Sequence, residues 1–175
     1  YPTLLAAFRE LLVTRPDASL VIAGRDVPAL REMADAMGTG ANVFLFECAP
    51  GWVPGTPPRL PPPELVNLFR AADVFVMSSL LEGFSTALLE AMAAGLPVAA
   101  TDAPGIRNQV RHGQTGFLSP VRDAAALAES LRALIENPGV RLRMGAAGLA
   151  EAAEFSWEKL AGRYAGLYRE LIQSR

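Results

Sequence analysis

One stretch of the sequence, residues 78–97, constrains the fold more than any other. An apolar run at 74–77 precedes it, and a second apolar run begins at Val98. Between the two runs, a polar segment passes through a glycine and then takes on the composition of a helix. The order strand, loop, helix, strand is typical of α/β proteins, which place polar groups at the carboxyl edge of a parallel sheet. Two glutamates, Glu82 and Glu90, flank the junction between the loop and the helix.

The bulk properties fit one folded domain and argue against several functional classes. The chain has 175 residues, enough to bury a core, and 51% of them are apolar, which argues against disorder. The net charge of −2 gives no indication that the chain binds nucleic acid. Cys48 is the single cysteine, so no internal disulfide or cysteine metal cluster is expected. We recognise no signal peptide and no apolar run long enough to cross a bilayer.

Predicted helices and strands alternate along most of the chain. Apolar residues at helical spacing indicate helices, and short apolar runs bounded by turn residues indicate strands. The alternation is typical of βαβ units and predicts an α/β fold, with a Rossmann-like parallel sheet flanked by helices and a helical segment at the end. The expected strands are 19–23, 42–46, 73–77, 97–101 and a short one within 112–118, and the expected helices are 3–14, 28–37, 64–71, 105–111, 123–136, 139–153 and 157–173.

Several local signals refine this prediction. Asp123 and Ser156 are expected N-caps, and either Ser85 or Thr86 should cap the helix of the central stretch. Residues 48–63 are too rich in Pro and Gly for a helix or a central strand, so they predict a long loop. Loops of this length are often functional and are otherwise insertions, and the sequence leaves both interpretations open.

The loop-to-helix junction has the chemistry to bind an anion and a diol. A capped helix leaves amides at its N-terminus that bind phosphate, and Gly83 lets a ligand approach the backbone closely. Glu90 lies four positions after Thr86 on the same helix face, and its carboxylate can accept hydrogen bonds from a ribose. The plainer interpretation is a solvated acid at Glu90 and a loop acid at Glu82, because most exposed acids have no function.

The same stretch resembles the signature of the group 1 (family 4) glycosyltransferases, which are retaining enzymes of the GT-B fold. The matching pattern is Ser79-x-x-Glu-Gly-Phe-Ser-x-x-x-Leu-Glu-Ala-Met-Ala-x-Gly-x-Pro-Val98. Four more segments resemble this family, at 21–24, 72–74, 112–118 and 155–157. The resemblance covers nearly the whole chain and implies that residues 1–175 are the carboxyl-terminal, nucleotide-sugar-binding domain, one half of a GT-B enzyme.

The resemblance also implies roles for the residues of the stretch. Glu90 would bind the ribose hydroxyls, and Glu82 would contact the donor sugar or lie beside the reacting centre as the expected catalytic residue. Donors aimed at the leaving diphosphate would stabilise charge that grows in the transition state. The backbone amides expected to face the sugar and the diphosphate are those of Gly83, Phe84, Ser85, Thr86 and Ala87.

Partners and cofactors follow from the same resemblance. We find no Asp-x-Asp pair, so we expect a metal-independent enzyme without a cofactor, whose substrate is a nucleoside-diphosphate sugar. The first strand of the domain, the basic diphosphate-binding loop and the acceptor-binding amino-terminal domain are expected to lie before Tyr1. No nucleic acid and no transmembrane segment are expected, and we expect a cytoplasmic protein, or one peripheral to a membrane through the missing domain.

Five other residues could carry chemistry, and for most of them the plainer interpretation is favoured. His112 is more plausible as a turn residue than as an acid–base group. Arg25 and Arg107 lie near sheet-edge loops but are favoured as surface residues over phosphate ligands. Cys48 is expected to be a packed thiol without an activating base. Trp52 could stack on a base or a partner, or could pin the long loop to the domain, and the two are not separable from sequence.

Three functional hypotheses remain open at this point. The first is the donor-binding half of a retaining glycosyltransferase that transfers a sugar from a nucleoside-diphosphate sugar to an acceptor. The second is a non-catalytic nucleotide-sugar-binding or scaffolding module of the same fold, although the presence of both Glu82 and Glu90 argues against lost catalysis. The third is another GT-B enzyme, such as an epimerase or a phosphorylase. A phosphorylase needs a pyridoxal-binding lysine, and the single lysine, Lys159, lies in a predicted terminal helix.

Overall fold

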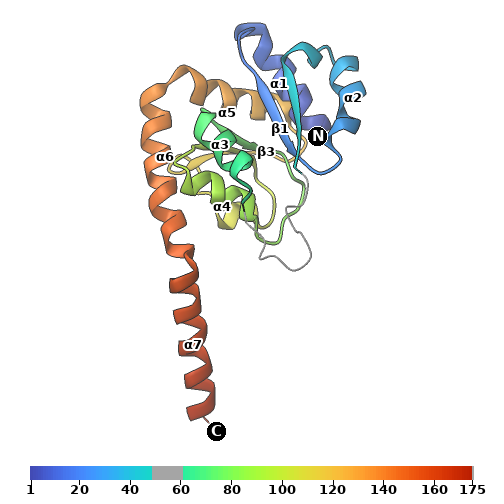
Figure 1. Cartoon of the computed structure of the whole chain (residues 1–175). Coiled ribbons are helices and arrows are strands. Elements are labelled where there is room, and N and C mark those ends of the chain that lie inside the picture. Colours follow the sequence, from blue (N-terminus) through green and yellow to red (C-terminus); the bar gives the residue numbers. More distant parts are fainter. Residues whose placement is uncertain (49–60, 175) are drawn as a thin grey trace.

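A computed structural model describes residues 1–48 and 61–174 and has the predicted α/β fold (Figure 1). The long loop expected at 48–63, including Trp52, falls almost entirely outside the described residues. Short 3₁₀-helices are labelled η. The elements in chain order are α1 (Pro2–Thr14), β1 (Leu20–Gly24), η1 (Val27–Leu30), α2 (Arg31–Ala36), η2 (Gly40–Asn42), β2 (Val43–Glu47), α3 (Pro63–Ala71), β3 (Phe75–Met77), α4 (Thr86–Ala93), β4 (Val98–Thr101), η3 (Ile106–Asn108), β5 (Gly116–Ser119), α5 (Ala124–Glu136), α6 (Pro138–Ala152), η4 (Ala153–Phe155) and α7 (Trp157–Gln173).

The strands form two parallel sheets, where the sequence predicted one. In the first sheet β1 pairs with β2, with Leu20 opposite Val43. In the second, β4 lies between β3 and β5. All four residues of β4 are buried, as expected for a central strand that is covered on both faces. Within the described residues β1 and β3 do not pair, so each keeps one open edge.

The predicted N-caps are confirmed, and each begins a helix at the expected place. The Asp123 carboxylate accepts a hydrogen bond from the Ala126 amide at 2.9 Å and begins α5. Ser156 caps α7. Of the two candidates for α4, Ser85 is the cap, because its hydroxyl oxygen accepts from the Leu88 amide at 3.3 Å. Such caps stabilise helices by satisfying amides that have no partner within the helix.

The helix predicted at 105–111 is wrong, because only a single 3₁₀ turn, η3, forms there. Gly105 precedes this turn with a φ of 88°, a left-handed conformation that cannot belong to an α-helix. Gln109 ends the turn with its side chain buried, and the chain then continues into a loop. The helix predicted at 28–37 is also shorter than expected, since its first residues form the 3₁₀ turn η1 and α2 begins at Arg31.

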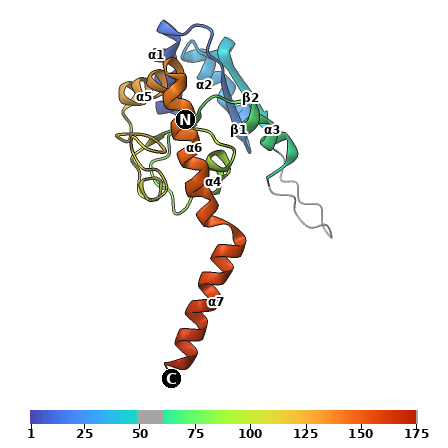
Figure 2. The same ribbon diagram turned by 90° about the vertical axis from the view of Figure 1, so that its left-hand side faces the viewer.

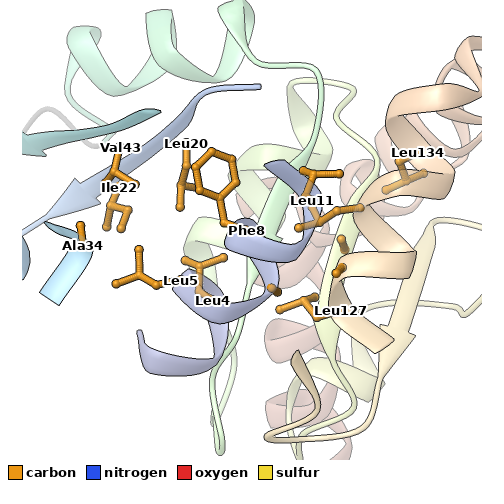
Figure 3. Close-up of a cluster of buried hydrophobic side chains, with 14 of the residues drawn as sticks. Leu4, Leu5, Phe8, Leu11, Leu20, Ile22, Ala34, Val43, Leu127 and Leu134 are labelled. Atoms are coloured by element: carbon orange, nitrogen blue, oxygen red, sulfur yellow. The ribbon is translucent and has the colours of Figure 1, made fainter. Parts of the chain in front are cut away.

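The larger core lies between α1, the first sheet and α5. Figure 3 shows the apolar side of α1 facing β1 and β2 at one end and α5 at the other. Burial of side chains of this size contributes about 1.5–3 kcal/mol each, so α1 is held mainly by this face. The buried residues labelled there are Leu4, Leu5, Phe8, Leu11, Leu20, Ile22, Ala34, Val43, Leu127 and Leu134.

A second core packs α4 on the second sheet. Leu88 and Met92 of α4 are fully buried against Val98 and Ala100 of β4, together with Ile106. The helix of the central stretch is therefore anchored through its apolar face. Its N-terminus remains at the carboxyl edge of the sheet, because α4 follows β3 directly through the loop 78–85.

The last helix, α7, extends away from the rest of the chain in two perpendicular views (Figures 1 and 2). None of its described residues is buried, and the Trp157 side chain is 88% exposed. The apolar side predicted for this helix therefore has no packing partner in the part of the chain that the structure describes. None of the described helices combines the length and the apolarity needed to cross a membrane.

The contact between α6 and the end of α4 yields a stability prediction. A Cβ atom at Gly145 would collide with the backbone carbonyl of Gly95, whereas a Cβ at Gly139 in the same helix meets nothing. Gly145→Ala should lower the free energy of unfolding by about 1–3 kcal/mol, because the backbone must shift to relieve the overlap.

Urea unfolding would measure this effect, with Gly139→Ala as the matched control. That variant should be neutral or stabilising by up to about 1 kcal/mol, because alanine restricts the unfolded chain. Equal destabilisation by both substitutions would show that the loss does not come from the contact with Gly95.

Candidate functional site

The candidate site lies where two loops meet at the carboxyl edge of the second sheet. The loop 78–85 follows β3, and the loop 102–105 follows β4. Because these strands are parallel neighbours, their following loops lie side by side. The Thr101 hydroxyl donates to the Ser79 carbonyl, and the Glu82 amide donates to the Pro104 carbonyl at 3.0 Å. These bonds hold the first loop against the second.

Glu82 is half-buried in this loop, and its side chain is oriented by a neighbour. Its Oε1 accepts a hydrogen bond from the Ser79 hydroxyl at 2.7 Å. Gly105 of the second loop lies so close that a Cβ would collide with the Glu82 and Gly83 carbonyls. Glycine is therefore required at 105 both for its positive φ and for this close approach. The loop that carries Glu82 thus depends on a glycine more than twenty residues later in the chain.

The start of α4 is held by a side chain that the sequence analysis missed. The Ser85 amide donates to Gln109 Oε1 at 2.8 Å, and Gln109 Nε2 donates to the Ser85 carbonyl at 2.9 Å. Gln109 is only 2% exposed. A lone glutamine in a segment predicted as helix has no spacing signal, so only the tertiary structure reveals this pair of bonds.

This pairing concerns one of the amides expected at the site. The Ser85 amide was expected to face a diphosphate, but it is committed to Gln109. Ser85 instead acts as the cap of α4 and as the point where the loop is fixed. Four other amides expected at the site make no hydrogen bond to the described part of the chain: those of Gly83, Phe84, Thr86 and Ala87. They lie at the positive end of the helix dipole, which favours an anion.

Glu90 lies one turn inside α4, on the same side as Thr86. Its side chain has no ion-pair or hydrogen-bond partner among the described residues. Burial raises the pKa of the Glu90 carboxyl above its ordinary value. A half-buried carboxylate without a cation is costly to keep, so Glu90 differs from the solvated helix acid of the plainer interpretation.

Phe84 links the site to the carboxyl-terminal helices. Its ring lies 5.4 Å from the ring of Phe155, centroid to centroid, at a tilt of 48°. Phe155 belongs to η4, the short turn between α6 and α7. The site loop therefore contacts the segment from which α7 leaves the domain, although the Phe84 side chain stays half exposed.

The other candidate residues have structural contacts. The His112 ring accepts from the Leu118 amide at 3.0 Å and meets Phe117 edge-on, which supports its role as a turn residue. Arg107 pairs with Asp102 at 3.0 Å. Burial raises the pKa of the Cys48 thiol, with Glu64 adding to the effect, so this thiol stays protonated as expected for a packed cysteine.

Two further observations concern residues that could bind a phosphate or a metal ion. Arg25 is exposed. Within 1–48 and 61–174, no group of three or more His, Cys, Asp or Glu side chains is arranged to hold a metal ion. Metal independence stays a prediction, because the absence of such a cluster does not test it.

Comparison with known proteins identifies the family to which these features belong. The family described as "Glycosyl transferases group 1" matches residues 1–150. A D-inositol 3-phosphate glycosyltransferase of Corynebacterium efficiens is 38% identical over 175 residues, covering 95% of this chain and 39% of the relative. The enzyme of the same name from Corynebacterium jeikeium is 33% identical over 177 residues, covering 96% of this chain and 40% of the relative. The chain thus spans less than half the length of these curated relatives.

Solved structures agree at the level of the fold. Sucrose-phosphate synthase from Thermosynechococcus elongatus superposes with a TM-score of 0.79 at 25% identity, over 99% of this chain and 43% of that one. Anabaena Alr3699/HepE in complex with UDP gives a TM-score of 0.81 at 21% identity, over 96% of this chain and 44% of that one. The predicted α/β fold, with parallel sheets flanked by helices as in GT-B glycosyltransferases, is therefore confirmed. With its fold and its central stretch in agreement, the chain belongs to the group 1 glycosyl transferase family.

Proposed function

We propose that this chain is the donor-binding half of a retaining, metal-independent glycosyltransferase that moves a sugar from a nucleoside diphosphate to an acceptor. The observation that carries the proposal is the start of α4. There, amides without partners in the described chain lie about one helical turn before Glu90, whose half-buried carboxyl also has no partner among the described residues. Membership of the group 1 family supports this assignment.

The proposed arrangement of the donor follows the chemistry of each group. The diphosphate lies at the N-terminus of α4, against the amides of Gly83, Phe84, Thr86 and Ala87, where the helix dipole favours negative charge. Glu90, one turn further along, accepts hydrogen bonds from the ribose hydroxyls. Glu82 lies beside the sugar, with its carboxylate oriented by Ser79.

The site would act on the transition state chiefly through charge. As the bond from the sugar to the diphosphate breaks, negative charge grows on the leaving oxygen. Amides that the fold already aims at this position stabilise the charge without having to reorganise. The Gln109 clamp on Ser85 keeps the helix start in place during this step, so Gln109 is proposed as a positioning residue.

The ligands and names of similar proteins indicate which nucleotide to test first. One structurally similar protein was solved with UDP and with UDP and glucose. Curated relatives carry the name D-inositol 3-phosphate glycosyltransferase. We therefore place UDP first among the nucleotides to be tested, with GDP and ADP as the alternatives. In the proposed enzyme, the acceptor binds to an amino-terminal domain that lies outside these 175 residues.

Titration calorimetry with UDP, GDP and ADP in the presence of a chelator tests this proposal. We expect weak binding of one nucleotide, and no sugar transfer by this chain alone. Glu90→Ala should weaken that binding by about 1.5–3 kcal/mol, which corresponds to a lost hydrogen bond to a charged group.

The matched control is Glu170→Ala, which removes an exposed carboxylate near the far end of α7. Its affinity should equal that of the unchanged chain. A folded chain that binds none of the three nucleotides would refute the donor site. Retained affinity in Glu90→Ala would remove Glu90 from that site while leaving the rest of the proposal in place.

The role of Gln109 can be tested in the same assay. Gln109→Ala removes both bonds to the Ser85 backbone and leaves buried polar groups unpaired, so the free energy of unfolding should fall by about 1–3 kcal/mol. Nucleotide affinity should fall as well, because the start of α4 loses its anchor. Gln114→Ala, at an exposed turn position, is the control and should change neither quantity. Unchanged affinity in folded Gln109→Ala would limit Gln109 to a purely structural role.

The raised pKa of Glu90 predicts a pH-dependent gain in stability for Glu90→Gln. A carboxyl whose pKa is raised on folding stabilises the fold while protonated, and this contribution is lost as the pH rises through the folded pKa. The variant should therefore unfold at higher urea than the unchanged chain at about pH 8, and the difference should shrink towards about pH 4. Glu170→Gln, which replaces an exposed carboxyl near the far end of α7, is the control and should lack this gain. A pH-independent difference for Glu90→Gln would contradict the burial of the charge as its cause.

A further inference from the structure

Two residues of the site loop, Gly83 and Phe84, lie between two points at which the backbone is fixed. On one side, the Glu82 amide is bonded to the loop after β4. On the other side, the Ser85 backbone is held by both bonds to Gln109. The amides of Gly83 and Phe84 make no hydrogen bond within the described residues. Exposed backbone without hydrogen bonds is among the most mobile in a protein, so another contact must hold these two amides in one position.

The Phe84 ring supplies such a contact, because it packs on the ring of Phe155. The two centroids lie 5.4 Å apart, and the ring planes are tilted by 48°. Aromatic rings at this separation attract each other beyond the apolar area that they bury. The pair therefore joins the unbonded part of the site loop to η4, the turn that follows α6.

Phe155 is brought to this position by α6, which packs along α4 (Figures 1 and 2). Gly145, Gly148, Ala152 and Phe155 follow one another at spacings of three and four residues. Residues at these spacings lie on one side of a helix, so Phe155 continues a single side of α6 into the turn. The first two members are buried glycines, and Ala152 packs against the second core. This side of α6 is therefore the one that faces α4.

The contacts of this side run along α4 from its end towards its start. A Cβ at Gly145 would collide with the carbonyl of Gly95, just after α4. A Cβ at Gly148 would lie 3.5 Å from the side chain of Met92, within the last turn of α4. Phe155 then reaches the loop before the helix. The absence of side chains at the two glycines lets the helices approach closely, and α6 carries Phe155 to the end of α4 where the free amides lie.

The turn that carries Phe155 is also held from the side of α7. Glu154 pairs with Lys159 at 2.6 Å and with Arg163 at 3.5 Å, and both partners belong to α7. The Ser156 hydroxyl caps α7 by accepting from the Lys159 amide at 3.4 Å. Both sequence neighbours of Phe155 are thus bonded to the following helix. Exposed ion pairs add little to global stability, but together with the cap they fix the local path of the backbone at Phe155.

We propose that Phe155 is a positioning residue of the donor site, a role that rests on the function proposed above. Its ring holds the Phe84 ring and thereby keeps the amides of Gly83 and Phe84 in place for the diphosphate. Amides that are already ordered bind an anion without a further loss of conformational freedom. Without the Phe155 ring, the same amides must be ordered during binding, and the affinity falls.

Three variants of the 175-residue chain test this role. Phe155→Leu removes the ring but keeps an apolar side chain, and Phe155→Tyr keeps the ring. Trp157→Leu is the matched control, because it removes a neighbouring aromatic side chain that is 88% exposed. NMR order parameters of the Gly83 and Phe84 amides are measured without nucleotide. Titration calorimetry with UDP, GDP and ADP then measures the affinity of each variant.

The unchanged chain, Phe155→Tyr and Trp157→Leu should all keep both amides ordered, with order parameters of about 0.85. Phe155→Leu should lower these values below about 0.6, while the Leu88 amide inside α4 stays ordered. Phe155→Leu should also weaken nucleotide binding by about three- to tenfold, which corresponds to the loss of one aromatic pair. Phe155→Tyr and Trp157→Leu should bind as the unchanged chain does.

Unchanged order parameters in Phe155→Leu would overturn the proposal, and so would lowered order parameters without a loss of affinity. Equal losses in Phe155→Tyr and Phe155→Leu would show that the ring is not the cause. A folded, unchanged chain that binds no nucleotide would refute the donor site, whereas the order parameters alone decide whether Phe155 holds the loop. If Phe155→Leu does not fold, nuclear Overhauser contacts between the two rings in the unchanged chain decide, and their absence refutes the pairing.

Discussion

The pair of hydrogen bonds between Gln109 and the Ser85 backbone is the interaction on which the candidate site depends. It joins two loops that follow different strands, and it is buried, so water does not compete for it. It fixes the residue that caps α4, and thereby the direction in which the helix presents its free amides. Gly105 completes the junction, because only a glycine allows the second loop to approach the Glu82 carbonyl.

Helix α4 combines a buried apolar face with a carboxyl that is costly to bury. The inward face of α4 is fully buried against β4, which holds the helix firmly. Glu90, on the same helix, is partly desolvated without a described partner, and burial raises its pKa. Such a group costs free energy in the folded chain and is the kind of residue that a bound ligand can satisfy. Within the described residues, α4 thus combines a buried apolar face with one carboxyl and several amides that have no hydrogen-bond partner.

In the described residues, the two sheets keep open strand edges and the last helix keeps an exposed apolar side. The open edges of β1 and β3 line an apolar cavity, and α7 leaves the domain with its apolar side exposed. Phe155, at the base of α7, contacts Phe84 in the site loop. The curated relatives are more than twice as long as the matched segment, which agrees with these unfilled surfaces.

Local sequence patterns predicted the fold class, most helices and strands, and the position of the candidate site. Periodicity located most of the helices, and short polar side chains before them identified the caps at Asp123 and Ser156 and left Ser85 or Thr86 for α4, because both signals act within a few residues. Contacts between distant parts of the chain set the remaining features. They reduce 105–111 to a single turn, engage the Ser85 amide with Gln109, leave Glu90 without a partner among the described residues and separate the sheet at β1 and β3. Each of these outcomes rests on residues that are distant in sequence, so no local pattern records them.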